Sequence, residues 1–422
     1  MDREEFLRQF DDDYRDDYEE EQQKKREQDP RRKYSKKQIE EMRKKKKKQL
    51  LFRRAGIILA LLLVVFLVIV LIVKAVQAMI KPSEANTPTE EAPTEKVDPY
   101  PYAAVFNRPE IADDKKTEGH YSSDSSDYYI YNNMALDTFS GDEGSAQSYA
   151  DTISGFKKRA PDLTVYNMVI PSHIEYALPQ RLLDSGSVTT NSQADYINTV
   201  YHAYSDDIVP INCYNKLSEH AADYLFFNTD NQITALGGYY AYTAFTEQTN
   251  QRTLDLKVCT EHLIDSYEGG LMYTDESVAS HPDSIHYWTF PYETYAERTA
   301  SMDSQPYELP IFYEEEESGA LAYGVFLWGD AALFVEHNQD IDGDKKIAVV
   351  KENSSNPFVS YLTADYKEVH IIDYRYFTGS IKSYCEKNGI TEVLFVNSTL
   401  SANNEDALSD LRAIYYKGDV TA

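Results

Sequence analysis

The sequence predicts an α/β fold with a doubly wound parallel sheet that carries an antiparallel β insertion. One transmembrane helix and a disordered cytoplasmic tail are expected to precede it. Three observations lead to this prediction. Short apolar runs alternate with helical patterns over residues 101–422, the alternation breaks at 265–345, and one uncharged run of nineteen residues lies near the N-terminus. Strands with continuous apolar runs are typical of parallel sheets, because helices cover both of their faces.

The uncharged run, AGIILALLLVVFLVIVLIV, begins the segment 55–74, which is predicted to cross a membrane as a helix. About 20 apolar residues, rising about 1.5 Å each, span a hydrocarbon core about 30 Å thick. Basic residues gather on its N-terminal side, so the positive-inside rule predicts a cytoplasmic N-terminus and an extracellular C-terminal domain in the cell membrane. A cleaved signal peptide is the alternative, but the run is too long and too far from Met1 for one.

Charge is distributed unevenly on the two sides of this segment. Residues 1–54 hold 19 Lys and Arg against 15 Asp and Glu, and the residues after 74 hold 22 against 55. Residues 1–54 lack apolar periodicity, which predicts a disordered tail. The basic run 24–54 in this tail is either a contact for anionic lipid or a topology signal alone. The acidic second set argues against nucleic acid as a partner, because phosphates repel it.

Beyond a spacer rich in Pro, Thr and Glu at 75–100, the sequence predicts one domain over residues 101–422. The expected parallel strands are 163–171, 208–214, 346–352, 368–373 and 392–397, and the expected helices are 145–159, 192–204, 379–389 and 405–415. The insertion is expected to form antiparallel strands with turns from the segments 290–295, 308–330 and 332–338. Functional loops should follow the carboxyl ends of the parallel strands.

No cofactor or metal is expected. The sequence lacks the glycine-rich nucleotide-binding motifs and the His-rich zinc motif. Asp340, Asp342 and Asp344 are spaced as calcium ligands can be, but the rest of an EF-hand loop is missing, which favours a hairpin turn. The three cysteines contain no CxxC spacing, so neither a zinc site nor a redox motif is indicated.

Three blocks hold the candidate chemistry: VYNMVIPSHIEYALP at 165–179, FFNTDNQITALGGYYAYTAF at 226–245 and VVKENSSNPFVSYLTADYKEVHIIDYRYF at 349–377. In this order they resemble the DHHW family of bacterial exported proteins, which is similar to the SGNH-hydrolase-like alginate O-acetyltransferases. The resemblance covers roughly residues 120–415. It implies an SGNH-hydrolase-like sheet and an acyl-transfer site at its strand ends.

In the family, the second block reads roughly T-D-H-H-W-T before G-A-Y-Y-A-Y, and its Asp and second His activate a serine. Thr229 and Asp230 match this pattern, whereas Gln232 stands at the position of that His. The third block reads roughly K-D-S-Y-x-N-x-F in the family, and its Ser is the nucleophile. The residues that match or replace it here are Lys351, Glu352 for the Asp, Asn353 for the Ser, Asn356 and Phe358.

These replacements predict that acyl transfer has been lost. A serine hydroxyl attacks only when a positioned base takes its proton. Asn353 has no hydroxyl, and Gln232 has no basic nitrogen. Both amides still hydrogen-bond well, which keeps a sugar-binding role open. The first hypothesis is therefore an inactive, membrane-anchored protein that binds a cell-envelope or exported polysaccharide or assists its modification.

Two alternatives remain open. Ser354 and Ser355 follow the lost nucleophile directly, and either would support an active O-acetyltransferase or esterase if a histidine reached it; capping of the next helix is their structural interpretation. The candidate histidines are His173, His262, His281, His286 and His337. The other alternative is a membrane scaffold that acts through its charged tail. The first hypothesis also predicts that Asn353 ends the strand 347–350 and faces Gln232 or Asp230 across a cleft.

Overall fold

The computed structural model describes residue 106 and residues 108–204, 207–314 and 318–416. The predictions for the tail at 1–54, the membrane helix at 55–74 and the spacer at 75–100 lie outside the described residues. Within the described ranges, no helix is both long and apolar enough to cross a membrane.

A mixed eight-stranded sheet forms the centre of the fold, in the order β5-β4-β13-β11-β12-β10-β8-β9. The first five strands run parallel and the last three continue the sheet antiparallel. Their bounds are β5 Ile208–Ile211, β4 Thr164–Ile170, β13 Glu392–Ser398, β11 Lys346–Lys351, β12 Glu368–Asp373, β10 Leu333–Asn338, β8 Thr294–Thr299 and β9 Tyr307–Leu309. The predicted parallel sheet with an antiparallel insertion is thus present in one continuous sheet.

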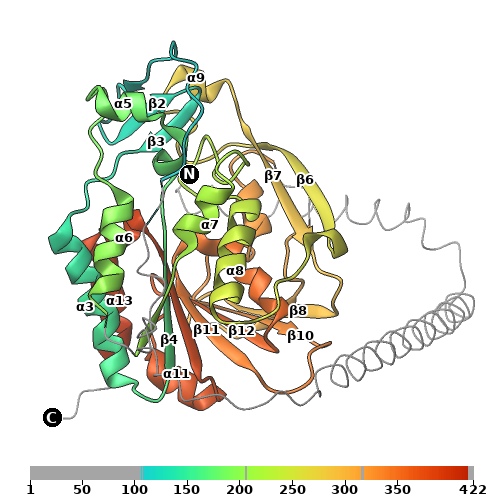
Figure 1. Cartoon of the computed structure of the whole chain (residues 1–422). Coiled ribbons are helices and arrows are strands. Elements are labelled where there is room, and N and C mark those ends of the chain that lie inside the picture. The colour runs from blue at the N-terminus through green and yellow to red at the C-terminus, as the bar shows by residue number, and fades with distance from the viewer. Residues whose placement is uncertain (1–105, 107, 205–206, 315–317, 417–422) are drawn as a thin grey trace, which may run out of the picture. The chain divides into compact units, whose positions relative to one another are not determined.

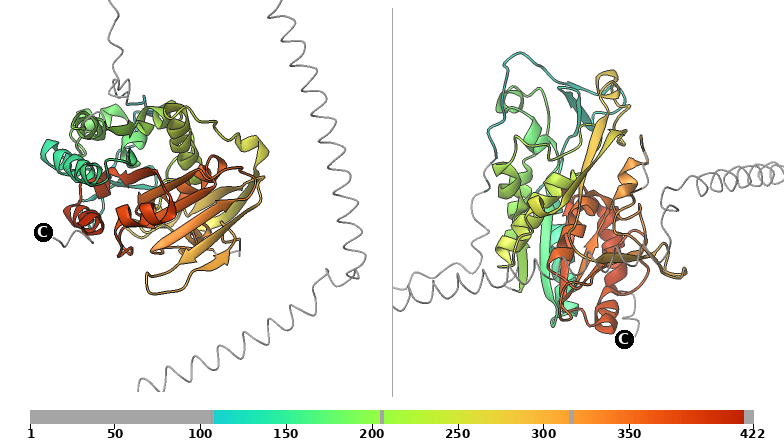
Figure 2. Two further views of the ribbon diagram at one scale, coloured as in Figure 1. Left: turned by 90° about the horizontal axis from the view of Figure 1, so that it is seen from below. Right: turned by 90° about the vertical axis from the view of Figure 1, so that its right-hand side faces the viewer.

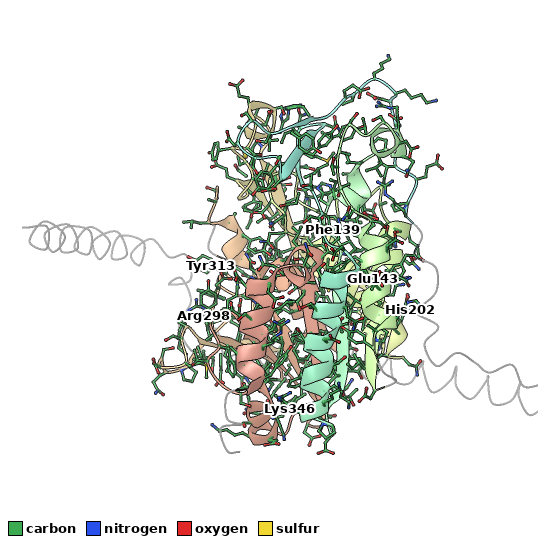
Figure 3. The ribbon with its side chains drawn as sticks, turned by 90° about the vertical axis from the view of Figure 1, so that its left-hand side faces the viewer. Phe139, Glu143, His202, Arg298, Tyr313 and Lys346 are labelled. Atoms are coloured by element: carbon green, nitrogen blue, oxygen red, sulfur yellow. The ribbon has the colours of Figure 1, made fainter. Side chains whose placement is uncertain are left out.

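Helices pack beside this sheet in two groups. One group contains α3 (Glu143–Arg159), α6 (Gln193–His202), α11 (Ile381–Asn388) and α13 (Glu405–Tyr416), and the other contains α7 (Cys213–Glu219), α8 (Ala235–Gln248) and α10 (Asn356–Val359). In Figure 1, α3, α6 and α13 lie to the left of β4, whereas α7 and α8 lie to its right, and Figure 2 shows the same ribbon from below and from the side. Figure 3 shows α3 next to α6, with Glu143 near the start of α3.

Short elements complete the described chain. A second sheet contains β1 (His120–Tyr121), β2 (Tyr128–Tyr131) and β3 (Met134–Asp137), and a two-stranded ribbon contains β6 (Thr260–Tyr267) and β7 (Asp283–Thr289). The remaining helical turns are α4 Ile174–Ala177, α5 Gln180–Asp184, η3 Leu256–Val258, α9 Glu276–Ala279, η4 Ala322–Val325, η5 Asn353–Ser355, η6 Ser360–Ala364 and α12 Thr399–Ala402. The sequence did not predict the second sheet or the ribbon, because their strands are mostly short or only partly apolar on one face.

The strand predicted at 208–214 is too long at its C-terminal end. It ends at Ile211, because the side chain of Asn212 accepts a hydrogen bond from the backbone N–H of Asn215 and so begins α7. Such a capping bond is worth about 1 kcal/mol and competes with the sheet for the backbone. The apolar residues after Asn212 are therefore buried on a helix rather than on a strand.

The segment 308–330, predicted to form antiparallel strands with turns, is only partly extended in the structure. Among its described residues, β9 pairs with the sheet and Phe312 forms an isolated antiparallel bridge with Phe326, whereas Ala322–Val325 forms a turn of 3₁₀ helix. Leu327 and Trp328 both adopt left-handed backbone conformations, with φ of 56° each, which no regular strand contains. Most apolar side chains of this segment are buried, Leu321 being an exposed exception, and this burial resembles a strand pattern in sequence.

Candidate functional site

The loop after β11 carries Asn353, which stands at the serine position of the family pattern. β11 is buried between two parallel neighbours, β12 and β13, and its last residue is Lys351. The Glu352 carboxylate accepts the backbone N–H of Ser354 at 2.7 Å and that of Ser398 at 3.2 Å. These bonds turn the chain sharply, so that Asn353 begins the 3₁₀ turn η5 directly past the strand end. This confirms the predicted position of Asn353 at the carboxyl end of the strand.

The hydroxyls of the two neighbouring serines, Ser354 and Ser355, both make hydrogen bonds within this loop. The hydroxyl of Ser354 donates to the Glu352 carboxylate, and that of Ser355 donates to the Glu352 carbonyl at 3.1 Å. The capping interpretation of the two serines is wrong in its detail, because Glu352 caps η5 and Ser355 makes no side-chain capping bond to α10. Ser355 is also fully buried, so no reagent in solution reaches its hydroxyl.

The five candidate histidines bind elsewhere, and none in the described part of the chain is hydrogen-bonded to Ser354 or Ser355. Their partners are the Phe227 carbonyl for His173, Thr289 for His262, the Ser277 carbonyl for His281, Glu261 for His286 and Glu297 for His337. Burial lowers the pKa of His173 to about 4, so that this side chain is neutral. A serine activated by histidine is therefore not assembled at this loop.

A buried ion network fixes the base of the loop. The Lys351 ammonium lies 3.0 Å from Asp373 Oδ2 and donates to Asn356 Oδ1 at 2.7 Å. Arg375 approaches the same carboxylate through Nε and Nη2, at 2.9 and 2.7 Å, and pairs with Asp330 at 2.9 Å. Burial alone raises the pKa of Asp373, but Lys351 and Arg375 outweigh it and hold that pKa below its usual value. The network therefore contains an ionised Asp373.

Asp230 and Gln232 lie in the turn before α8. Asp230 accepts hydrogen bonds from the Tyr267 hydroxyl at 2.6 Å, the Gly270 N–H at 2.8 Å and the Gln232 N–H at 3.2 Å. Burial raises its pKa. These hydrogen bonds hold the turn before α8 together.

Helix packing brings the two motif blocks together. A Cβ on Gly238 would lie 2.9 Å from the backbone of Pro357, closer than packed atoms approach. Only glycine therefore lets α8 come this near to α10, the helix that follows the Asn353 loop. The Tyr361 hydroxyl adds a hydrogen bond of 3.0 Å to the Ala235 carbonyl. Gly238 thus has a packing role between the two motif blocks.

Tyr323 connects the two positions that the sequence predicted to face each other. Its hydroxyl lies 3.3 Å from Gln232 Oε1 and 2.8 Å from the Asn353 carbonyl. Its ring stacks on Tyr267, which in turn binds Asp230. The structure therefore brings Asp230, Gln232 and Asn353 into one hydrogen-bonded arrangement, although more than a hundred residues separate the two blocks.

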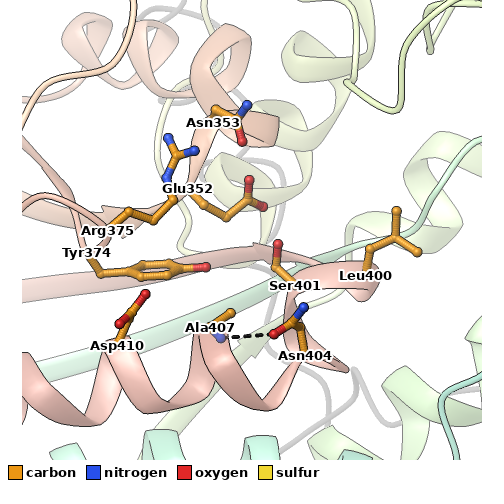
Figure 4. Close-up of a pocket in the computed structure, with 9 residues that line it drawn as sticks. All are labelled: Glu352, Asn353, Tyr374, Arg375, Leu400, Ser401, Asn404, Ala407 and Asp410. Atoms are coloured by element: carbon orange, nitrogen blue, oxygen red, sulfur yellow. Dashed lines mark hydrogen bonds between the residues drawn. The ribbon is translucent and has the colours of Figure 1, made fainter. Parts of the chain in front are cut away.

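A pocket of about 360 Å³ opens beside Asn353 (Figure 4). The turn after β11 and the end of β12 form one wall, and α12 with the start of α13 forms the other. Its lining residues are Glu352, Asn353, Tyr374, Arg375, Leu400, Ser401, Asn404, Ala407 and Asp410. Amide, hydroxyl and carboxylate groups dominate this set, so the pocket suits a polar ligand.

Sequence reasoning missed several residues of the site. Tyr323 lies in an irregular segment with no motif, and Arg375 and Asp410 lie outside the family pattern. Asp137, on β3, was also missed, although burial and the nearby charge of Asp230 raise its pKa to about 7. The described residues contain no group of His, Cys, Asp and Glu that would hold a metal ion, and all three cysteines are free.

Fold and pocket together define a mixed α/β protein whose candidate site lies at the carboxyl ends of parallel strands. The model of the DHHW protein family matches residues 86–372, and the chain belongs to this family. The comparison with curated proteins returned no match.

Solved structures share the fold. A DHHW family protein from Eubacterium siraeum is 23% identical with a TM-score of 0.62, and the match covers 70% of this chain and 97% of that one. Bacillus cereus PatB1, in a structure with a sulfonyl adduct, is 16% identical with a TM-score of 0.54, over 67% of this chain and 96% of that one. The O-acetyltransferase domain of Pseudomonas putida AlgJ gives a TM-score of 0.39, too low to establish a shared fold.

Proposed function

We propose that this protein is a membrane-anchored extracellular member of the DHHW family that has lost acyl transfer and binds a cell-envelope or exported polysaccharide, or assists its modification. One observation carries the proposal. The Tyr323 hydroxyl contacts both the Gln232 side chain and the Asn353 backbone carbonyl, and the family pattern assigns its base and its nucleophile to these two positions, which hold amides here. We infer that the backbone arrangement of the site persists in this chain without the serine hydroxyl and the imidazole that acyl transfer needs.

The pocket beside Asn353 supplies the binding role. Its volume of about 360 Å³ has room for a sugar unit of a chain that continues into solvent. Asn353 and Asn404 offer amides, and Ser401 offers a hydroxyl. Asn353 and Ser401 can both donate and accept hydrogen bonds, as sugar hydroxyls require, and Asn404, whose Oδ1 caps α13, can donate through its amide nitrogen.

The full chain, purified in detergent, is expected to show no esterase or acetyl-transfer turnover and no labelling by a fluorophosphonate. The reason is that such labelling needs an activated nucleophile, and neither serine of the loop has a histidine partner. Ser354 is the serine of this loop that could still act as a nucleophile, because its hydroxyl donates a hydrogen bond to the Glu352 carboxylate. Turnover or labelling that disappears in Ser354→Ala and persists in Ser401→Ala would replace the proposal with a displaced-serine enzyme.

The anchor and tail belong to the same proposal. The apolar segment 55–74 would hold the domain at the membrane, and the basic run 24–54 would contact anionic lipid on the cytoplasmic side. A tail peptide should bind vesicles that contain phosphatidylserine, and replacing Lys44 to Lys48 by Gln should weaken that binding and its salt dependence. Unchanged binding would reduce the run to a topology signal, and a protein partner captured by the tail would favour the scaffold alternative.

A further inference from the structure

We propose that the pocket beside Asn353 selects neutral glycans and rejects glycans that carry carboxylates or phosphates. This inference rests on the proposed function and adds the class of ligand. Its basis is the set of charges that line the pocket and the partners that each of them already has.

Arg375 is the cation among the lining residues, and its charge is already matched. Two carboxylates, Asp373 and Asp330, lie within 2.9 Å of its guanidinium nitrogens. Lys351, the next nearest cation of the network, is buried behind the pocket against Asp373 and Asn356. An anionic sugar would have to compete with these carboxylates for both cations, and it would leave a buried charge unpaired if it succeeded.

The N-terminus of α13 is the other positive feature at the pocket. Helix N-termini attract anions through unpaired backbone N–H groups. Here Asn404 Oδ1 accepts the N–H of Asp406 at 2.9 Å and that of Ala407 at 3.1 Å, the latter drawn in Figure 4. The capping side chain therefore takes the donors that an anion would use.

The carboxylates of the pocket, in contrast, have no cationic partner within the described ranges. Glu352 accepts from Ser354 and Ser398 only, all of them uncharged donors, and Asp410 is exposed on α13 with no ion pair. The two unmatched negative charges repel an anion, whereas a sugar hydroxyl donates to a carboxylate favourably.

The experiment uses the full chain in detergent and three matched pairs of β-1,4-linked tetrasaccharides. Each pair consists of a neutral gluco-, manno- or galacto-tetramer and its uronate counterpart, oxidised at C6. Titration calorimetry is expected to show at least one neutral member binding about tenfold or more tighter than its uronate partner. This preference should shrink at about 1 M salt, where the Debye length falls to about 3 Å.

Two variants test the cause. Asp410→Asn should reduce the preference for the neutral member several-fold, because it removes an exposed negative charge at the pocket. Asp406→Asn, on the same helix but outside the lining, is the matched control and should leave the preference unchanged. Uronate members that bind as tightly as neutral ones, or an Asp410→Asn variant with undiminished preference, would overturn this inference alone. Absence of binding by every tetrasaccharide would overturn the proposed function as well.

Discussion

The double variant Gln232→His with Asn353→Ser is expected to acquire esterase activity. In the structure, the Asn353 carbonyl and the Gln232 side chain share the Tyr323 hydroxyl, and Asp230 lies two residues before Gln232. A serine at the end of β11 would then have an imidazole nearby and a carboxylate behind it, the arrangement that activates a hydroxyl. We expect hydrolysis of p-nitrophenyl acetate about 10²-fold above the parent chain, the lower end of what a positioned base supplies.

The single variants are the controls for this prediction. Asn353→Ser alone has no base and Gln232→His alone has no nucleophile, so each should stay near the background of the parent chain. Fluorophosphonate should label the double variant and leave both single variants unlabelled. A double variant that melts within a few degrees of the parent but neither reacts nor labels would show that the two positions do not form the pair.

The sequence predicted the parallel part of the sheet well. β4, β11, β12 and β13 lie within one or two residues of their expected bounds, because buried parallel strands are continuous apolar runs bounded by turns. The error at Ile211 arose where a single capping side chain, Asn212, decided between strand and helix. A local hydrogen bond of this kind has no periodicity, so a pattern of apolar residues does not reveal it.

The site was only partly predictable for a different reason. Asn353 and Gln232 were found because motif blocks mark them, whereas Tyr323 reaches both from an irregular turn far from either block. No spacing in the sequence encodes which loop lies over a strand end. The same holds for Arg375 and Asp410, whose meeting at the pocket depends on how α13 packs beside the ends of β11 and β12.

Asp373→Ala is expected to lower the free energy of unfolding by about 3–5 kcal/mol, the range for a broken buried ion pair. Lys351 is nearly fully buried, and without Asp373 its ammonium would keep only the Asn356 oxygen as a partner. Arg375 would lose both of its contacts to Asp373 and keep its ion pair with Asp330. Urea denaturation followed by fluorescence measures the loss. The control is Glu386→Gln, which breaks an exposed pair with Lys382 and should change stability by less than about 1 kcal/mol.

The stabilisation by Asp373 should also depend on pH in one direction. Its pKa in the folded protein lies below the usual value, which is about 3.9 in an unfolded chain. Folding therefore favours the ionised form, so the contribution is complete above about pH 4 and is lost as the pH falls through the lowered folded pKa. The difference in stability between the parent chain and Asp373→Asn should accordingly be constant near neutral pH and shrink in acid. A difference that grows in acid, or that is absent at neutral pH, would show that the ion network does not fix the loop beneath Asn353.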